Sequence, residues 1–235
     1  MEPLTVLFVD LSCIVSFDSV LRQLLLLDGQ LEQNHLHQFV AFNKAYFVVT
    51  SSIKQAFEDD HFENPKFIET FTVAFSRYYF QAINDSARSN PRMAVAWSKM
   101  NTINRAGITP SFIPLLMGAN AHINHDLPIV LLASMQESEA DGLLKDIVKL
   151  DHLLMKSGRE IIRTFVEPNK LLDTVRRRFQ FLYYRPVMYV ILRWRINAWR
   201  SYKSLRKGSK NKEKYVARSA KIATHLLSMG RHLPS

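Results

Sequence analysis

The sequence predicts an all-α protein in which a single domain of 235 residues forms a multi-helix bundle. Three observations favour this fold class. Apolar residues recur at intervals of three and four, which is the period of amphipathic helices. Only 7 glycines are present, too few for the frequent tight turns of a many-stranded sheet. Hydrophobic residues make up 47% of the chain and charged residues 22%, as expected for a chain that buries one core.

The most regular periodic segments are aromatic. A helix is expected from His37 to Phe57, and a second from about Asn64 to Asn84 with Pro65 in its first turn. Aromatic stripes at helical spacing are usually core, so we interpret the face of the first helix as packing. Three residues on this stripe are kept apart as candidate site residues: Asn43, Tyr46 and Thr50.

Shorter or less regular helices are expected along the rest of the chain. Their bounds are Val20 to Leu31, Pro91 to Asn104 as a short helix or turn, Leu143 to Phe165, Leu171 to Tyr184, Pro186 to Leu205 and Tyr215 to Leu227. We divide the chain into an apolar leader (1–16), the helical domain (17–206), and a basic linker with a C-terminal helix (207–235).

The segment from Phe112 to Met135 is nearly all apolar, which predicts a helix at the centre of the bundle. Within it His122 and Asp126 are four residues apart, so they share a helix face, and His125 lies on its flank. Pro128 follows closely and predicts a kink or break just behind this cluster.

Polar groups in such a helix need partners, because an unpaired buried charge is costly. Three interpretations of His122 and Asp126 remain open. The pair belongs to a buried network with an Arg, a Tyr or backbone groups freed by Pro128. Alternatively it binds a divalent metal ion, with Asp146 and Asp151 as further ligands. In the third interpretation it is an acid/base pair in which Asp126 sets the tautomer of His122.

Known motifs narrow these interpretations only slightly. The spacing matches neither the zinc protease motif nor the carboxylate and histidine pairs of di-iron bundles, and no serine or cysteine nucleophile is indicated. The segment from Arg193 to Arg200 places Arg195 and Trp199 on one helix face. Arg195 is therefore expected to be the counter-charge of a buried carboxylate.

The formal net charge is +10, and most of the excess follows Arg176. The cations concerned are Arg176, Arg177, Arg178, Arg185, Lys203, Arg206, Lys207, Lys210, Lys212 and Lys214. A basic last third of this kind predicts one of two roles. It binds an anionic membrane surface or an acidic partner, or it is an ordinary basic face in contact with solvent. Nucleic acid is not the expected partner.

The single cysteine, Cys13, excludes an intrachain disulfide and a CxxC redox pair, which favours a reducing compartment. No stretch reaches the length of apolar sequence needed to span a bilayer. The leader contains Glu2 and Asp10 and lacks a basic start, unlike a signal peptide. We therefore expect a cytoplasmic protein, with peripheral membrane contact as an alternative.

Several motifs, taken in order, resemble the domain-of-unknown-function 5995 family. They are Phe42-Asn43-x-x-Tyr46-x-x-x-Thr50, Phe75-x-Arg77-Tyr78, Trp97, Ala121-His122-Ile123-Asn124-His125-Asp126-Leu127 and Arg195-x-x-Ala198-Trp199. The resemblance covers about residues 17 to 206, and its most specific part is the A-H-I-x-x-D-L segment. That family is mostly bacterial and has no established activity. The resemblance implies a shared helical fold and a shared site at His122 and Asp126, followed by Asp146, Asp151, Arg195 and Trp199.

The leading hypothesis is a small-molecule enzyme or ligand-binding protein in which His122 and Asp126 are the catalytic pair or the metal ligands. If it is an enzyme, metal-assisted or His-based hydrolysis comes first. The expected supporting residues are Asn43, Tyr46, Thr50, His125, Asp146, Asp151, Arg195 and Trp199. The alternative is a non-catalytic helical module that docks through its basic last third, with His122 and Asp126 in structural roles. The sequence fixes neither the ligand nor the oligomeric state.

Overall fold

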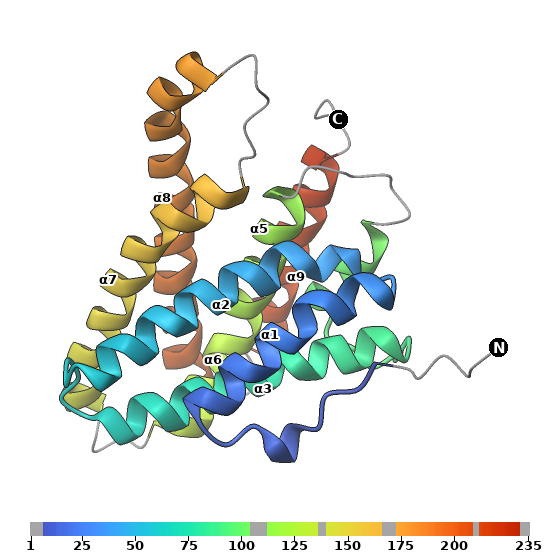
Figure 1. Cartoon of the computed structure of the whole chain (residues 1–235). Helices are drawn as coiled ribbons and strands as arrows, with labels where there is room; N and C mark the ends of the chain where they lie inside the picture. Colours follow the sequence, from blue (N-terminus) through green and yellow to red (C-terminus); the bar gives the residue numbers. More distant parts are fainter. Residues whose placement is uncertain (1–6, 104–111, 136–139, 166–172, 209–211, 231–235) are drawn as a thin grey trace.

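The computed structural model describes residues 7–103, 112–135, 140–165, 173–208 and 212–230 (Figure 1). All regular structure in these ranges is helical, and no strand occurs in them. The predicted all-α, multi-helix fold class is therefore confirmed. None of the described helices is both long and apolar enough to cross a membrane.

The helices follow the predicted periodic segments closely. They are α1 (Phe17–Gln33), α2 (His37–Glu58), α3 (Pro65–Ala87), α4 (Val95–Ser98), α5 (Phe112–Asn120), α6 (Leu127–Ser134), α7 (Ala140–Phe165), α8 (Asp173–Arg206) and α9 (Lys212–Gly230). Two 3₁₀ segments lie at Leu11–Cys13 and Lys99–Thr102. A π-helical segment, Ala121–Asp126, joins α5 to α6.

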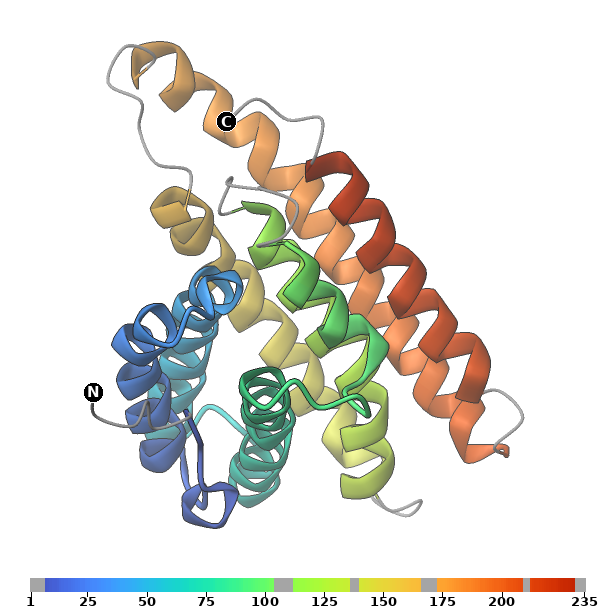
Figure 2. The same cartoon turned by 90° about the vertical axis from the view of Figure 1, so that its right-hand side faces the viewer.

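Two groups of helices make up the molecule. Figure 2 shows α7, the helix formed by α5 and α6, α8 and α9 running roughly side by side, with α1, α2 and α3 on one side of them. Helix α2 joins the groups because it contacts α1 and α3 as well as α5 and α7. The hydrophobic core extends through both groups without interruption.

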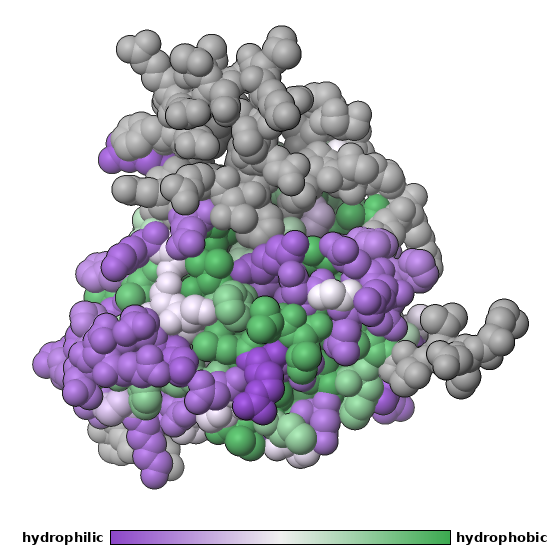
Figure 3. All heavy atoms as spheres, in the orientation of Figure 1, coloured by the Kyte–Doolittle hydropathy of each residue, from purple (hydrophilic) through white to green (hydrophobic). Residues whose placement is uncertain are grey.

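The face formed by α1, α2 and α3 carries some apolar surface of its own. Figure 3 shows hydrophobic surface in the middle of this face, surrounded by hydrophilic side chains. Helix α1 exposes Leu25 and Leu26 while burying Leu24 and Leu27. This face lies opposite α8 and α9 in both cartoon views.

The described part of the expected leader packs onto α3. Asn84 forms two hydrogen bonds with the backbone of Val9, of 2.7 and 2.9 Å, and Arg77 donates to the carbonyl of Ile14. The side chains of Val9 and Ile14 are buried. Residues 7–16 are therefore held against the helical core.

Helix α9 also packs into the core. It contacts α5 and the π-helical segment, and Asn120 donates a 3.0 Å hydrogen bond to the carbonyl of Ser219. Ala223, Leu226 and Leu227 are buried. The C-terminal helix is thus an integral layer of the fold.

The prediction of two helices separated near Arg185 is wrong. Helix α8 runs without a break from Asp173 to Arg206, with Pro186 inside it. Proline removes one backbone donor and disturbs the preceding turn, but tertiary contacts can offset that cost. Here α8 packs against α6, α7 and the π-helical segment, which hold it as one helix.

Of the kink or break predicted at Pro128, the break does not occur. Helical structure continues from Phe112 to Ser134, and Pro128 lies in the first turn of α6. The N–H of Leu127 bonds to the carbonyl of His122, five residues earlier, so the turn is widened at this point. A widened turn accommodates the proline ring without ending the helix. The His/Asp cluster therefore lies within the π-helical segment.

Candidate functional site

Asp126 is the centre of the candidate site. It is 1% exposed and accepts three hydrogen bonds. Its Oδ2 accepts from Trp97 Nε1 at 3.0 Å and from His122 Nδ1 at 3.0 Å, and its Oδ1 accepts from His125 Nδ1 at 2.8 Å. The shared helix face expected for His122 and Asp126 thus brings them into direct contact.

The protein keeps Asp126 ionised. Burial alone would raise the pKa of this carboxyl, but the hydrogen bonds from His122 and His125 outweigh burial, so its pKa lies below the ordinary value. Trp97 adds a neutral donor from the segment after α3. Both oxygens of this buried carboxylate therefore have hydrogen-bond donors.

His122 is kept neutral by the same surroundings. Burial lowers its pKa, and this effect exceeds the opposing influence of Asp126, while the positive charge of Arg195 lowers the pKa further. Because Asp126 is an acceptor, the ring proton is assigned to Nδ1. Nε2 then keeps its lone pair and can accept a proton or a hydrogen bond.

Aromatic rings fix the orientation of the His122 imidazole. Phe75 stacks on it with the ring centroids 3.6 Å apart and the planes 10° from parallel. Tyr46 meets the imidazole edge-on at 4.8 Å, and Phe42 does so at 5.7 Å. The imidazole of His122 is therefore in contact with three aromatic rings and hydrogen-bonded to Asp126.

His122 borders a cavity of about 140 Å³ between α2, α3, α5, the π-helical segment, α7 and α8. Its walls are mostly apolar, and the polar or charged residues among them are Tyr46, Thr50, Thr72, His122 and Arg195. Tyr46 and Thr50, two of the three candidate site residues on the aromatic stripe, thus border the same cavity as His122.

Three buried polar atoms belong to residues bordering this cavity: Tyr46 Oη, Thr50 Oγ1 and His122 Nε2. None of them has a hydrogen-bond partner in the described part of the chain. Buried polar groups are nearly always paired, so such a concentration at one cavity is unusual. The cavity therefore combines mostly apolar walls with three residues whose buried polar atoms have no partner in the described part of the chain.

Asn43, the third stripe residue, has a different position. It donates to the carbonyl of Leu24 at 2.8 Å and accepts a hydrogen bond from the hydroxyl of Tyr79 at 3.2 Å. It therefore joins α1, α2 and α3, and it is not among the residues that border the cavity.

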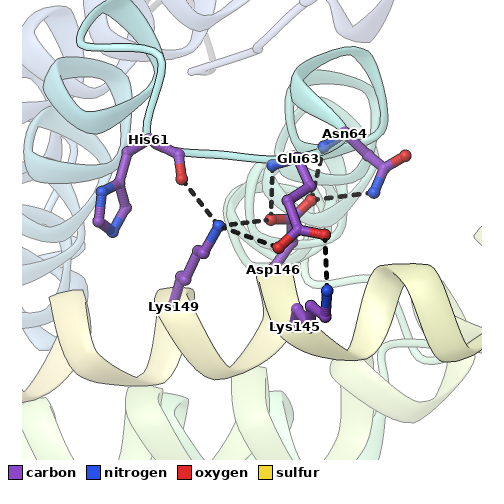
Figure 4. A network of polar contacts seen from close by, with 6 residues as sticks. All are labelled: His61, Glu63, Asn64, Lys145, Asp146 and Lys149. Carbon is purple, nitrogen blue, oxygen red and sulfur yellow. Dashed lines mark hydrogen bonds and ion pairs between the residues drawn. The ribbon is translucent and has the colours of Figure 1, made fainter.

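Asp146 does not lie with the His/Asp pair, contrary to the metal-site hypothesis (Figure 4). Its carboxylate accepts hydrogen bonds from the backbone N–H groups of Glu63 and Asn64, at 2.9 and 2.7 Å, where α3 begins. Lys149 lies 3.6 Å from the same carboxylate. Asp146 thus caps the start of α3 from α7.

Arg195 pairs with Asp151 on α7 and not with Asp126. Together with Trp199 these residues border a second cavity of about 200 Å³, formed by α3, α6, α7 and α8. Arg195 borders both cavities. Arg195 is therefore the counter-charge of a partly exposed carboxylate and not, as expected, of a buried one.

The ligand set expected for a metal ion is not assembled. His122, Asp126, Asp146 and Asp151 lie in three different networks or cavities, and both oxygens of Asp126 are engaged by protein donors. Over the described residues, no group of three or more His, Cys, Asp or Glu side chains is arranged to hold a metal ion.

Two contributors to the site were absent from the predicted site residues. Trp97 is one of the motifs that resemble the family, but no helical spacing pairs it with Asp126, which is 29 residues away in the sequence. Phe75 belongs to an aromatic stripe, so its stacking on His122 looked like ordinary packing. Both contacts depend on tertiary structure.

The basic last third is partly described. From Arg185 to Gly230 the sequence contains one acidic residue, Glu213. The exposed cations in this part are Arg185, Arg193, Arg200, Lys203, Arg206, Lys207, Lys214, Arg218 and Lys221. The side chains of Arg176, Arg177, Arg178, Lys210 and Lys212 lie outside the described residues.

Comparison with known families adds one finding. Residues 17–234 match a family of unknown function, DUF5995. The chain belongs to DUF5995. The match starts at the residue expected from the motifs and extends beyond 206 to include α9 of this DUF5995 protein. No match was found among curated proteins or among solved structures.

Proposed function

We propose that this DUF5995 protein binds a small, mostly apolar molecule in the cavity beside His122, with a polar group of the ligand at His122 Nε2. The observation that carries the proposal is the set of unpaired buried atoms on Tyr46, Thr50 and His122 around one apolar cavity. Ligand sites are typically apolar clefts with a few convergent polar groups.

The size of the cavity limits the ligand. Its volume of about 140 Å³ is close to that of an engineered apolar cavity of about 150 Å³ that binds benzene. The apolar part of the ligand is therefore a single aromatic ring or a short branched chain. Phe75, stacked on His122, provides a flat apolar wall.

The His122–Asp126 pair is suited to general-base chemistry. A water beside Nε2 would give its proton to the neutral imidazole as its oxygen adds to the acyl carbon of an ester. When this intermediate collapses, the bond between the acyl carbon and the alcohol oxygen breaks, and the imidazolium gives the proton to that leaving oxygen. Asp126 would stabilise the imidazolium that forms. Burial raises the pKa of Tyr46, so its hydroxyl stays protonated and can donate to a carbonyl oxygen. His-based hydrolysis is thus the reaction class that we propose.

Binding of 4-methylphenol tests the ligand site. Calorimetry is carried out on the wild type, His122→Gln and the matched control His125→Gln, which also loses a bond to Asp126 but keeps the cavity wall. We expect saturable binding to the wild type and the control. Binding to His122→Gln should be about tenfold weaker, as for loss of one good hydrogen bond. Equal affinity in all three proteins would contradict the proposal.

Hydrolysis of phenyl acetate tests the reaction. Turnover above the uncatalysed rate should fall about a hundredfold in His122→Gln, the lower range for loss of a general base. It should also fall in Asp126→Asn, which disturbs the tautomer of His122. No turnover by the wild type would restrict the proposed function to binding.

Docking on an anionic membrane surface is the second candidate function. It is supported by the exposed cations of α8 and α9 and by the sequence from Arg185 to Gly230, in which Glu213 is the one acidic residue. Phosphatidylserine vesicles should sediment the protein at low salt and release it as ionic strength rises. Reversal of Lys214, Arg218 and Lys221 to Glu should abolish sedimentation. This function would place the protein in the cytoplasm, where anionic lipids face it.

A further inference from the structure

Arg195 is a charged group set between two apolar cavities. Its side chain is 13% exposed, and it borders both the cavity beside His122 and the second cavity. The two cavities also share Phe71 and Leu150. Any molecule long enough to occupy both would therefore pass the guanidinium.

The hydrogen bonds of Arg195 are incomplete. Its Nε donates to Asp151, and no acceptor for its two Nη groups is found among the described residues. A guanidinium offers five N–H donors in a planar fork that matches a carboxylate. Asp151 holds the side chain in place and leaves the Nη edge for another acceptor.

The second cavity reaches the surface of the molecule. Leu144, Val148 and Ile196 border it and are each between 43 and 46% exposed. The second cavity therefore has exposed apolar side chains at its border, and it shares Arg195, Phe71 and Leu150 with the cavity beside His122.

We propose that the ligand is a small amphipathic acid, whose carboxylate binds the Nη groups of Arg195 while its apolar body and second polar group extend to His122. This inference rests on the proposed binding function and specifies its ligand class. A carboxylate fits better than a doubly charged phosphate, because Asp151 and the ionised Asp126 already supply negative charge near the site.

The experiment compares three neutral or acidic phenols by calorimetry: 4-methylphenol, 4-hydroxybenzoate and 4-hydroxyphenylacetate. At least one acid should bind the wild type about tenfold more tightly than 4-methylphenol, the ratio that corresponds to about 1.4 kcal/mol. Arg195→Gln should remove this advantage but still bind 4-methylphenol, which also shows that the variant is folded. Arg193→Gln, an exposed position on the same helix, should behave as the wild type.

Asp151→Asn gives a change in the opposite direction. Its amide oxygen still accepts from Nε, but the competing charge is gone, so the acids should bind several-fold more tightly. Acids that bind no better than 4-methylphenol, or an advantage that survives Arg195→Gln, would overturn the carboxylate site and leave the proposed function standing. Tighter binding of phenyl phosphate than of either acid would also overturn it. No binding of any phenol would overturn the proposed function itself.

Discussion

At the scale of single residues, Asp126 gathers donors from two distant parts of the chain. His122 and His125 come from its own helix, and Trp97 comes from the short helix after α3. The carboxylate is ionised because these donors outweigh its burial. Each donor should therefore contribute measurably to the stability of the fold.

Trp97→Phe keeps the aromatic ring and removes the donor to Asp126 Oδ2. We expect a loss of about 1 to 3 kcal/mol in the free energy of unfolding, because a buried charged acceptor loses a partner. Urea unfolding gives this value. Trp199→Phe is the control, since that indole does not contact Asp126 and should cost less. Equal losses would argue against the hydrogen bond.

His122 makes stability depend on pH. Burial holds its folded-state pKa below the ordinary value of 6.5, so the unfolded chain takes up a proton at higher pH than the native protein does. Its contribution is complete above pH 6.5 and is lost as the pH falls through that value toward the lower folded pKa. Urea unfolding across this window should show a steeper loss for the wild type than for His122→Gln. Parallel curves would contradict the assignment of a neutral His122.

Sequence spacing identified the local half of this site. Positions four apart in a helix share a face, which was sufficient to pair His122 with Asp126. Helical spacing could not predict the partners of Asp146, because its carboxylate oxygens accept hydrogen bonds from backbone N–H groups 82 and 83 residues away in the sequence. The contacts of Trp97 and Phe75 likewise form only when α3, α4 and the π-helical segment come together.

At the scale of helices, the spacing of apolar residues predicted where most helices lie. It did not predict the backbone hydrogen-bond pattern around the prolines. Pro128 and Pro186 both suggested interruptions, and both lie within continuous helical structure. A π turn accommodates Pro128 and tertiary packing accommodates Pro186. The spacing of apolar residues in the sequence predicts neither the π turn nor this packing. The widened turn matters for the site because it contains His122 and Asp126.

The close approach of α2 and α5 can be tested at Gly118. A Cβ built there would lie 2.5 Å from Cγ of Phe42, which itself packs against His122. Gly118→Ala should therefore destabilise the fold by about 1 to 3 kcal/mol through overpacking. Gly29→Ala is the matched control in α1, where nothing lies within 4 Å, and it should stabilise by about 0.5 to 1 kcal/mol. The same sign at both sites in thermal unfolding would contradict this packing.

At the scale of the whole molecule, α9 completes the core around the π-helical segment. The basic composition after Arg206 suggested a region separate from the helical domain, because charge is more visible in a sequence than the few small buried residues. Ser219 and Ala223 are fully buried against the rest of the fold. The family match through residue 234 includes this helix.

Two alanines of α9 test its packing. Ala223→Asp places a carboxylate in the core and should reduce the free energy of unfolding by several kcal/mol. Ala217→Asp changes an exposed position of the same helix and should cost less than about 1 kcal/mol. Urea unfolding compares the two. A small effect at Ala223 would mean that α9 is not part of the cooperative core.

The proposed ligand site requires a neutral His122 that presents an unprotonated Nε2 to the cavity. Nitrogen-15 NMR of the labelled imidazole at neutral pH tests it most directly, with His125 as the internal reference. We expect the His122 proton on Nδ1, and an Nε2 resonance that moves when 4-methylphenol saturates the protein, while the resonances of His125 change little. A protonated Nε2, or a resonance that is unaffected by the phenol, would contradict it.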